Sequence, residues 1–216
     1  MFEEIFEKIR ARLDYFYEKR EFALKLSRDM LKYLRESMRL AHNKQLKEAI
    51  AQLNKAKFVM DKIKEVCKAE PRITYSGFWL DVSKEYAETA IFLWILKRCY
   101  LNKDESLPTP EKLEVSDEAW ILGLCEVVGE LKREILTLAR RHEFEQAFIF
   151  LNIIDEIYML VSQLSYPSSI IPNLKARIDY VRAILVSAEE LLIKLHNEYE
   201  LAIKLDALRR EKEIRK

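Results

Sequence analysis

Residues 2–42 read FEEIFEKIRARLDYFYEKREFALKLSRDMLKYLRESMRLAH, and this stretch decides the fold class. Its large apolar side chains recur at spacings of three and four residues, at Phe2, Ile5, Phe6, Ile9 and Leu13 and again at Phe22, Leu26, Met30, Leu34 and Met38. That spacing is typical of one face of an α-helix. It predicts one helix over residues 2–42, far longer than the average of about 11–12 residues.

The rest of the chain continues this helical period between its prolines. A composition of only 3 Gly and 5 Pro leaves little room for the turns that an all-β fold needs. We expect an all-α bundle of about six to seven helices in a single domain over residues 1–216. The expected helices after the first cover about residues 44–69, 75–100, 116–142, 145–164 and 172–205, with a further helix start at Thr109 and Pro110.

Composition and charge exclude several classes of protein. The 216-residue chain is 50% hydrophobic and 34% charged, which excludes a disordered polymer. A formal net charge of +1 excludes a uniformly basic nucleic-acid-coating protein, although a basic groove can be hidden in a neutral total. The three cysteines, Cys67, Cys99 and Cys125, form no CxxC pair and predict a reducing, cytoplasmic setting. The longest apolar runs are too short to span a membrane.

Carboxylates are the remaining candidates for chemistry, since no nucleotide-binding, triad or paired Glu-x-x-His string is present. Glu85 and Glu88 lie on one stripe of the helix expected over 75–100. Glu126 and Glu130 interrupt a nearly continuous apolar stretch of the next helix. A bound Mg²⁺ or Mn²⁺ would offset the repulsion and the burial cost of such acids.

An ordinary structural role competes with the metal site. Glutamate pairs at helical spacing are common in a chain with 36 acidic residues, and most lie on solvated faces or in ion pairs. From the carboxylates alone, a solvated or ion-paired role is the better hypothesis for Glu85 and Glu88, and by a smaller margin for Glu126 and Glu130.

Several strings together resemble the translin/TRAX family, which comprises translin and translin-associated factor X (TRAX). They occur in the family order along most of the chain. The most specific are KEYAE at residues 84–88 and GELKR at residues 129–133, and the others are LKLSRDM at 24–30, WILGLCEVVGELKR at 120–133 and LKARIDYVR at 174–182.

The resemblance implies a fold, an assembly and a site. The family fold is an all-α bundle of about seven helices that assembles into ring- or shell-like oligomers, typically octamers, around single-stranded RNA or DNA. TRAX supplies metal-dependent endoribonuclease activity, and its acidic cluster maps onto Glu85, Glu88 and Glu126, with Glu130 at the neighbouring glutamate of the same signature. The family has aspartate at the position of Glu126. Because translin lacks the acidic pair matched by Glu85 and Glu88, this chain resembles TRAX, and its short length suggests an archaeal or other prokaryotic homo-oligomer.

The implied chemistry is phosphodiester hydrolysis. Glu85, Glu88 and Glu126 would hold the divalent ion, and Glu130 would complete the catalytic cluster. Basic side chains would position the strand through its phosphates. The candidates are Arg28, Lys132, Arg133, Arg177 and Arg182, each of which could instead serve a surface ion pair.

Two other functions stay open on the sequence. One is a non-cleaving oligomer that binds single-stranded RNA or DNA, and the other is a helical scaffold whose apolar helices serve only assembly. In all three cases we expect self-association, because the apolar runs Ile91–Leu96 and Ala147–Val161 present more surface than one bundle easily covers.

Overall fold

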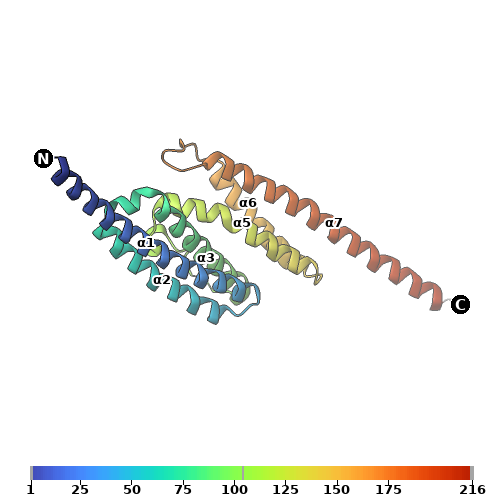
Figure 1. Cartoon of the computed structure of the whole chain (residues 1–216). Helices are drawn as coiled ribbons and strands as arrows, with labels where there is room; N and C mark the ends of the chain where they lie inside the picture. The colour runs from blue at the N-terminus through green and yellow to red at the C-terminus, as the bar shows by residue number, and fades with distance from the viewer. Residues whose placement is uncertain (1, 104, 215–216) are drawn as a thin grey trace. The chain divides into compact units, whose positions relative to one another are not determined.

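The computed structural model describes residues 2–103 and 105–214. These residues form seven α-helices and one 3₁₀ helix, with no strand among them (Figure 1), namely α1 (Phe2–His42), α2 (Leu46–Ala69), η1 (Pro71–Ser76), α3 (Phe78–Leu101), α4 (Pro110–Leu113), α5 (Asp117–Ala139), α6 (Phe144–Val161) and α7 (Leu174–Ile214). The all-α prediction is confirmed, and the long first helix has the predicted bounds.

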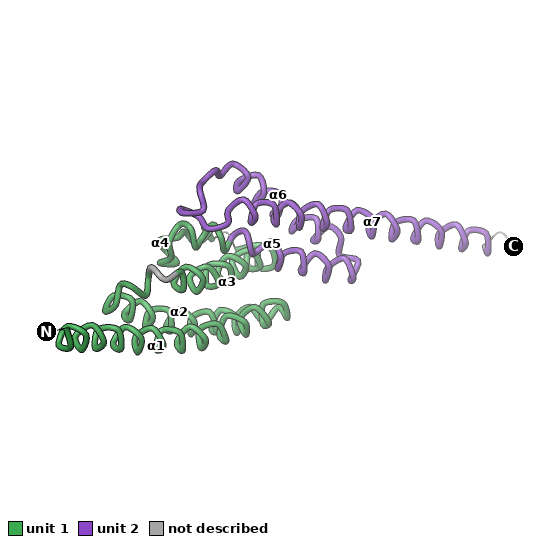
Figure 2. Tube along the Cα trace, turned by 45° about the horizontal axis from the view of Figure 1, so that its top comes forward, with its two compact units in different colours: residues 1–123 green, residues 124–216 purple. Residues whose placement is uncertain are grey.

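The described chain divides into two compact units, residues 1–123 and 124–216 (Figure 2). The first holds α1 to α4 and the opening turns of α5, and the second holds the rest of α5 with α6 and α7. The single domain that the sequence predicts over residues 1–216 stays a prediction.

In the first unit, α1 and α2 form a helical hairpin that α3 packs against. The hairpin turns at Lys44, whose φ of 63° lies in the left-handed region. Buried Ser37 of α1 donates a hydrogen bond of 2.8 Å to the Ala49 carbonyl of α2, which ties the two helices together near the turn. The core of this unit includes Met30, Met60 and Ile63, all fully buried.

Local sequence signals explain where the middle helices begin. Gly77 has a φ of 78°, which only glycine adopts freely, so α3 begins at Phe78 rather than at the predicted Tyr75. The Thr109 hydroxyl accepts a hydrogen bond of 3.3 Å from the Lys112 amide, which confirms the predicted cap at the start of α4. Ser116 caps α5 in the same way through the Ala119 amide, also at 3.3 Å.

The apolar run Ile91–Leu96 is core and not surface. Five of its six residues are buried within the chain, and Trp94, the sixth, donates its indole N–H to the Glu105 carbonyl at 2.9 Å. The expectation that this run serves self-association is therefore wrong, because α3 is covered by its own chain. In Ala147–Val161, Ile149, Met159 and Leu160 remain exposed.

The second unit is built around contacts of α7 with α6 and α5. Fully or nearly fully buried side chains include Leu131 and Ile135 of α5, Phe150 and Ile154 of α6, and Val181 of α7. Within the described residues, no helix has both the length and the apolar character needed to cross a membrane.

Candidate metal centre

Glycine at position 123 allows α5 to approach α3 closely. An added Cβ there would lie 2.8 Å from the Glu88 amide nitrogen, 2.9 Å from the Lys84 carbonyl oxygen and 3.0 Å from the Ala87 Cβ. These distances leave no space for a side chain, so the backbone of α5 rests on the turn of α3 that carries Glu85 and Glu88.

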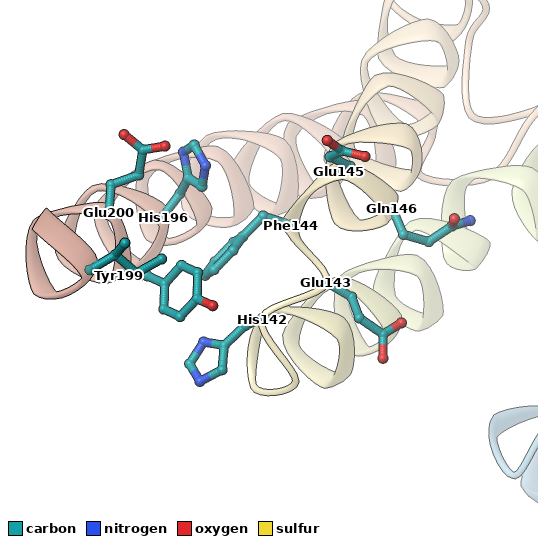
Figure 3. Close-up of a pocket in the computed structure, with 9 residues that line it drawn as sticks. His142, Glu143, Phe144, Glu145, Gln146, His196, Tyr199 and Glu200 are labelled. Atoms are coloured by element: carbon teal, nitrogen blue, oxygen red, sulfur yellow. The ribbon is translucent and has the colours of Figure 1, made fainter. Parts of the chain in front are cut away.

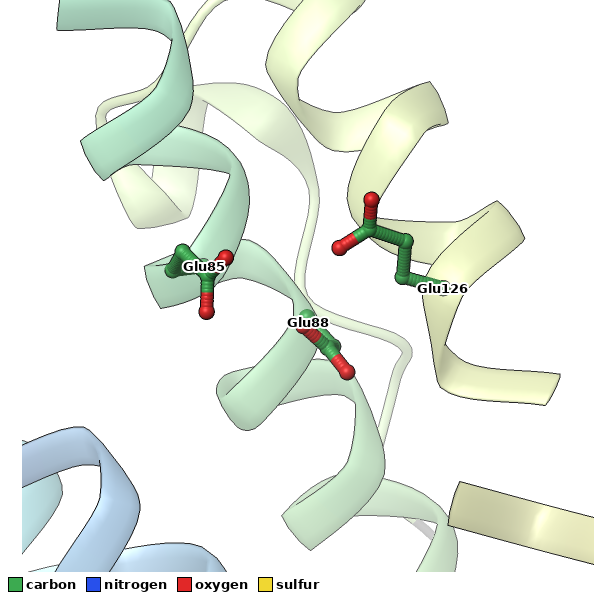
Figure 4. A group of neighbouring side chains, drawn as sticks. All are labelled: Glu85, Glu88 and Glu126. Carbon is green, nitrogen blue, oxygen red and sulfur yellow. The ribbon is translucent and has the colours of Figure 1, made fainter. Parts of the chain in front are cut away.

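Glu126 lies three residues after Gly123 on the same unbroken helix. Because a helix turns once in about 3.6 residues, Glu126 is on the side of α5 that Gly123 presents to α3. One carboxylate oxygen from each of Glu85, Glu88 and Glu126 can be chosen so that all three lie within 4.8 Å of one another, and Figure 4 shows the two helices that carry them. All three side chains are half-buried.

The donor set fits a hard divalent cation. Two oxygens on the same Mg²⁺ can be at most about 4.2 Å apart, twice the usual Mg²⁺–oxygen distance. The observed limit of 4.8 Å is close enough for small side-chain rotations to close the group around one ion. Three carboxylates this close repel one another, and a cation would relieve that repulsion.

Two basic side chains lie beside these acids. The Arg177 guanidinium is 2.6 Å from a Glu126 carboxylate oxygen, with 36% and 17% of the two side chains exposed. The Lys84 ammonium lies 3.7 Å from Glu85. Arg177 was predicted as a phosphate contact, with an ion pair as the alternative, and the structure shows it in an ion pair with Glu126.

The other predicted residues are spread over the surface. Glu130 is not a member of the carboxylate group and lies 3.9 Å from exposed Arg133. Lys132 donates a hydrogen bond of 2.7 Å to Ser187 of α7, while Arg28 and Arg182 are exposed. RNA contact by these basic residues stays a prediction.

Two residues of this region carry signals that sequence reasoning missed. Gly123 and Gly129 are two of the three glycines in the chain, and both lie inside a helix, where glycine is unfavourable. A glycine in a helix interior often marks close packing. That signal could have pointed to the contact between α5 and α3.

A cleft of about 480 Å³ lies between the start of α6 and α7 (Figure 3). The His142 ring stacks on Tyr199 at 4.3 Å between ring centroids, and the His196 ring lies 5.0 Å from Phe144. Both histidines thus pack against aromatic rings. Neither belongs to the carboxylate group that the described residues form.

Comparison with known proteins gives the family. The model of the translin family matches residues 18–196. An uncharacterized protein of Methanocaldococcus jannaschii is 26% identical over 167 residues, which cover 77% of this chain and 71% of the relative. The crystal structure of AfC3PO has a TM-score of 0.73 and 25% identity, over 88% of this chain and 95% of that one. That of apo-NeC3PO has a TM-score of 0.74 and 19% identity, over 88% and 96%.

Proposed function

This chain belongs to the translin family, and on that premise we propose that it is a subunit of an RNA-binding oligomer that cleaves single-stranded RNA with a divalent metal ion. The observation that carries the proposal is the group formed by Glu85, Glu88 and Glu126, with one oxygen of each within 4.8 Å of the others. Binding of RNA is supported by the similar protein AfC3PO, for which a complex with duplex RNA has been solved.

In this proposal Glu85, Glu88 and Glu126 hold Mg²⁺ or Mn²⁺. When bound, such an ion supplies Lewis-acid activation of a phosphodiester and of water. Arg177 has the right position to help, because its guanidinium touches Glu126 and five N–H donors suit it to a phosphate oxygen. Neutralisation of Glu126 by a cation would weaken its hold on Arg177, which could then bind the phosphate of the strand.

Phosphate contacts away from the carboxylates would hold the strand without reading its bases. Arg28, Arg133 and Arg182 are exposed enough to make them. Because such contacts are shared among several side chains, we expect RNA affinity to survive the loss of any single carboxylate.

The decisive experiment compares Glu126→Gln with wild type in two assays. We expect the variant to lose Mg²⁺-dependent cleavage of a labelled single-stranded RNA and to bind Mn²⁺ more weakly by calorimetry, while its RNA affinity is unchanged. Glu36→Gln is the matched control, because Glu36 pairs with Arg39 at 2.6 Å through a side chain that is 41% exposed. It should cleave as wild type does, and EDTA should stop cleavage by both active proteins.

A thermal melt of the same variant separates catalysis from structure. Arg177 is 36% exposed and can reach water when its partner is neutral. Loss of the ion pair in Glu126→Gln should therefore lower the free energy of unfolding by about 1 kcal/mol or less, as for exposed pairs. A broken buried pair would lower it by roughly 3–5 kcal/mol. A variant that melts much earlier yet still cuts RNA at the wild-type rate would identify Glu126 as a structural residue.

A non-cleaving RNA- or DNA-binding subunit is the second candidate function. The ion pair between Arg177 and Glu126 favours it, because a carboxylate that already has a cationic partner needs no metal. RNA binding by the wild type without cleavage in Mg²⁺ or Mn²⁺ would establish this function. Failure to bind single-stranded or duplex RNA would leave only the scaffold.

A further inference from the structure

The first turns of α1 carry an uncovered apolar stripe. Its side chains are exposed to between 39%, for Ile9, and 78%, for Phe2. The first buried residue of α1 is Ala23. Figure 1 shows these turns extending beyond the other helices of the first unit. We use the term arm stripe for Phe2, Ile5, Phe6, Ile9 and Leu13.

The exposed arm stripe has the character of an interaction surface. Its five residues recur at spacings of three and four, so they form one continuous apolar face. Contiguous exposed apolar surface usually marks an interaction site. An isolated helix of this length is only marginally stable in water, and packing of its apolar face is the usual source of stability. The arm stripe precedes residues 18–196, which match the translin family.

The charges in the first turns of α1 fall, along the helix, into an acidic half and a basic half. Residues 3–7 contain three acids and no base, and residues 8–12 contain three bases and no acid. An antiparallel copy of the same helix would place the acidic half of each chain beside the basic half of the other. A parallel copy would place acid beside acid and base beside base, which opposes pairing.

We propose that the arm stripe pairs antiparallel with the arm stripe of a second copy of the chain, about a two-fold axis between Glu7 and Lys8. Such an interface is self-complementary, as two-fold symmetry requires. In this register Phe6 lies beside Ile9 of the second copy. Phe2 lies beside Leu13 of the second copy.

The existing charge contacts do not oppose this arrangement. The ion pair of Lys8 with Glu4 has both side chains at least 70% exposed, so it is weak and easily exchanged for an intermolecular pair. The balance of three acids and three bases also makes an anionic membrane surface a poor partner, because membrane-surface helices concentrate Lys and Arg on the polar face. This inference does not depend on the proposed RNA cleavage.

A pair of charge variants tests the complementarity. One carries Lys at positions 3, 4 and 7, and the other carries Glu at positions 8, 10 and 12. Each alone should sediment at half the mass of the wild-type assembly, and an equimolar mixture should regain the full mass. Two variants that each keep the wild-type mass would overturn the proposal.

Cysteine cross-linking tests the orientation. Under mild oxidation, Phe2→Cys alone should give no more covalent dimer than the wild type with its own three cysteines. Its mixture with Leu13→Cys should give disulfide-linked dimer, because both positions face the interface and are adjacent only in the antiparallel pair. Cross-linking of Phe2→Cys to itself would mean a parallel pair and would refute the two-fold arrangement.

A matched control distinguishes the other possible partners. Phe6→Glu should halve the assembly mass, whereas Leu201→Glu on α7, at a position 58% exposed, should leave it unchanged. If Leu201→Glu also halves the mass, α7 covers the stripe and the proposal fails. It fails too if Phe6→Glu keeps the wild-type mass but no longer floats with anionic vesicles that carry the wild type. Circular dichroism should show both variants folded, since neither position is in the core.

Discussion

Replacing Gly123 by alanine tests whether the approach of α5 to α3 builds the candidate metal centre. The added methyl would lie 2.8 Å from the Glu88 amide nitrogen and 2.9 Å from the Lys84 carbonyl oxygen. Both are backbone atoms within a helix, so neither can rotate away. Ordinary contact begins at 3.4 Å, so the helices must separate locally by several tenths of an ångström.

Two effects of opposite sign set the change in stability. Alanine is favoured over glycine in a helix by about 0.8–1 kcal/mol. Inserting a methyl into a closely packed contact costs about 1–3 kcal/mol. We therefore expect Gly123→Ala to lower the free energy of unfolding by about 1 kcal/mol, or about 2–4 °C in Tm for a chain of this size.

In Gly123→Ala the affinity for the metal ion should fall by more than the free energy of unfolding does. Ligands must be held within about 0.5 Å of the binding geometry, and the displaced turn of α5 leads directly to Glu126. We expect the affinity for Mn²⁺, measured by calorimetry, to fall at least about tenfold, as happens when the residues that orient metal ligands are mutated.

Gly129→Ala is the matched control, because it makes the same exchange in the same helix. There the added Cβ would meet only the side chain of Tyr180, whose hydroxyl oxygen would be 2.7 Å away. Tyr180 is 40% exposed and can swing toward solvent, so the gain in helix propensity should offset the contact. Equal melting temperatures for the two variants, with wild-type Mn²⁺ affinity in Gly123→Ala, would refute this reasoning.

Acid should weaken the attachment of α4 to α2, because hydrogen bonds from two lysines, Lys64 first, lower the pKa of Glu114 from 4.5 to about 2. A lowered pKa contributes stability that is full above pH 4.5 and is lost as the pH falls through about 2. Urea unfolding of wild type and Glu114→Gln should differ by under about 1 kcal/mol at pH 6, since the side chain is 56% exposed, and most of that difference should be gone at pH 2.5. Burial raises the pKa of the Cys125 thiol to about 11, so iodoacetamide at pH 8 should modify half-buried Cys99 first, and mass spectrometry of peptides showing Cys125 labelled first would contradict the packing. Phe92→Ala at a fully buried site should cost about 3–5 kcal/mol in urea unfolding, whereas Phe58→Ala at a site 62% exposed should cost little, and equal costs would contradict the core described for α3.

Helices and caps could be predicted because their signals are local. The period of three and four residues over residues 2–42 gave both bounds of α1, since nothing in the stretch interrupts it. The Thr109 cap was predictable because threonine is a preferred N-cap residue and proline is favoured in the first helical turn that follows. The start of α3 was not, because the helical pattern runs back through Gly77 and only the φ of 78° shows that this residue ends η1.

The candidate site could be predicted only in part. Glu85 and Glu88 share a helical stripe, which spacing alone gives, but their closeness to Glu126 depends on which face of α5 meets α3. The ion pair of Glu126 with Arg177 joins residues 51 positions apart in sequence, and no periodicity links them. The run Ile91–Leu96 is apolar on all sides, which predicts burial but does not say whether the same chain or a second subunit covers it, and the structure shows that it is the same chain.

The single long helix α7 should not behave as a single unit in hydrogen exchange. Its buried residues end at Leu192, and every described side chain from Glu200 to Glu213 is exposed. Amide protection reflects local opening, which is easiest where few apolar contacts must be broken. Protection factors should therefore be high in the turns around Val181 and fall steadily after Leu192. The last turns of α7 would then unwind and re-form many times for each opening of the segment that packs on α6.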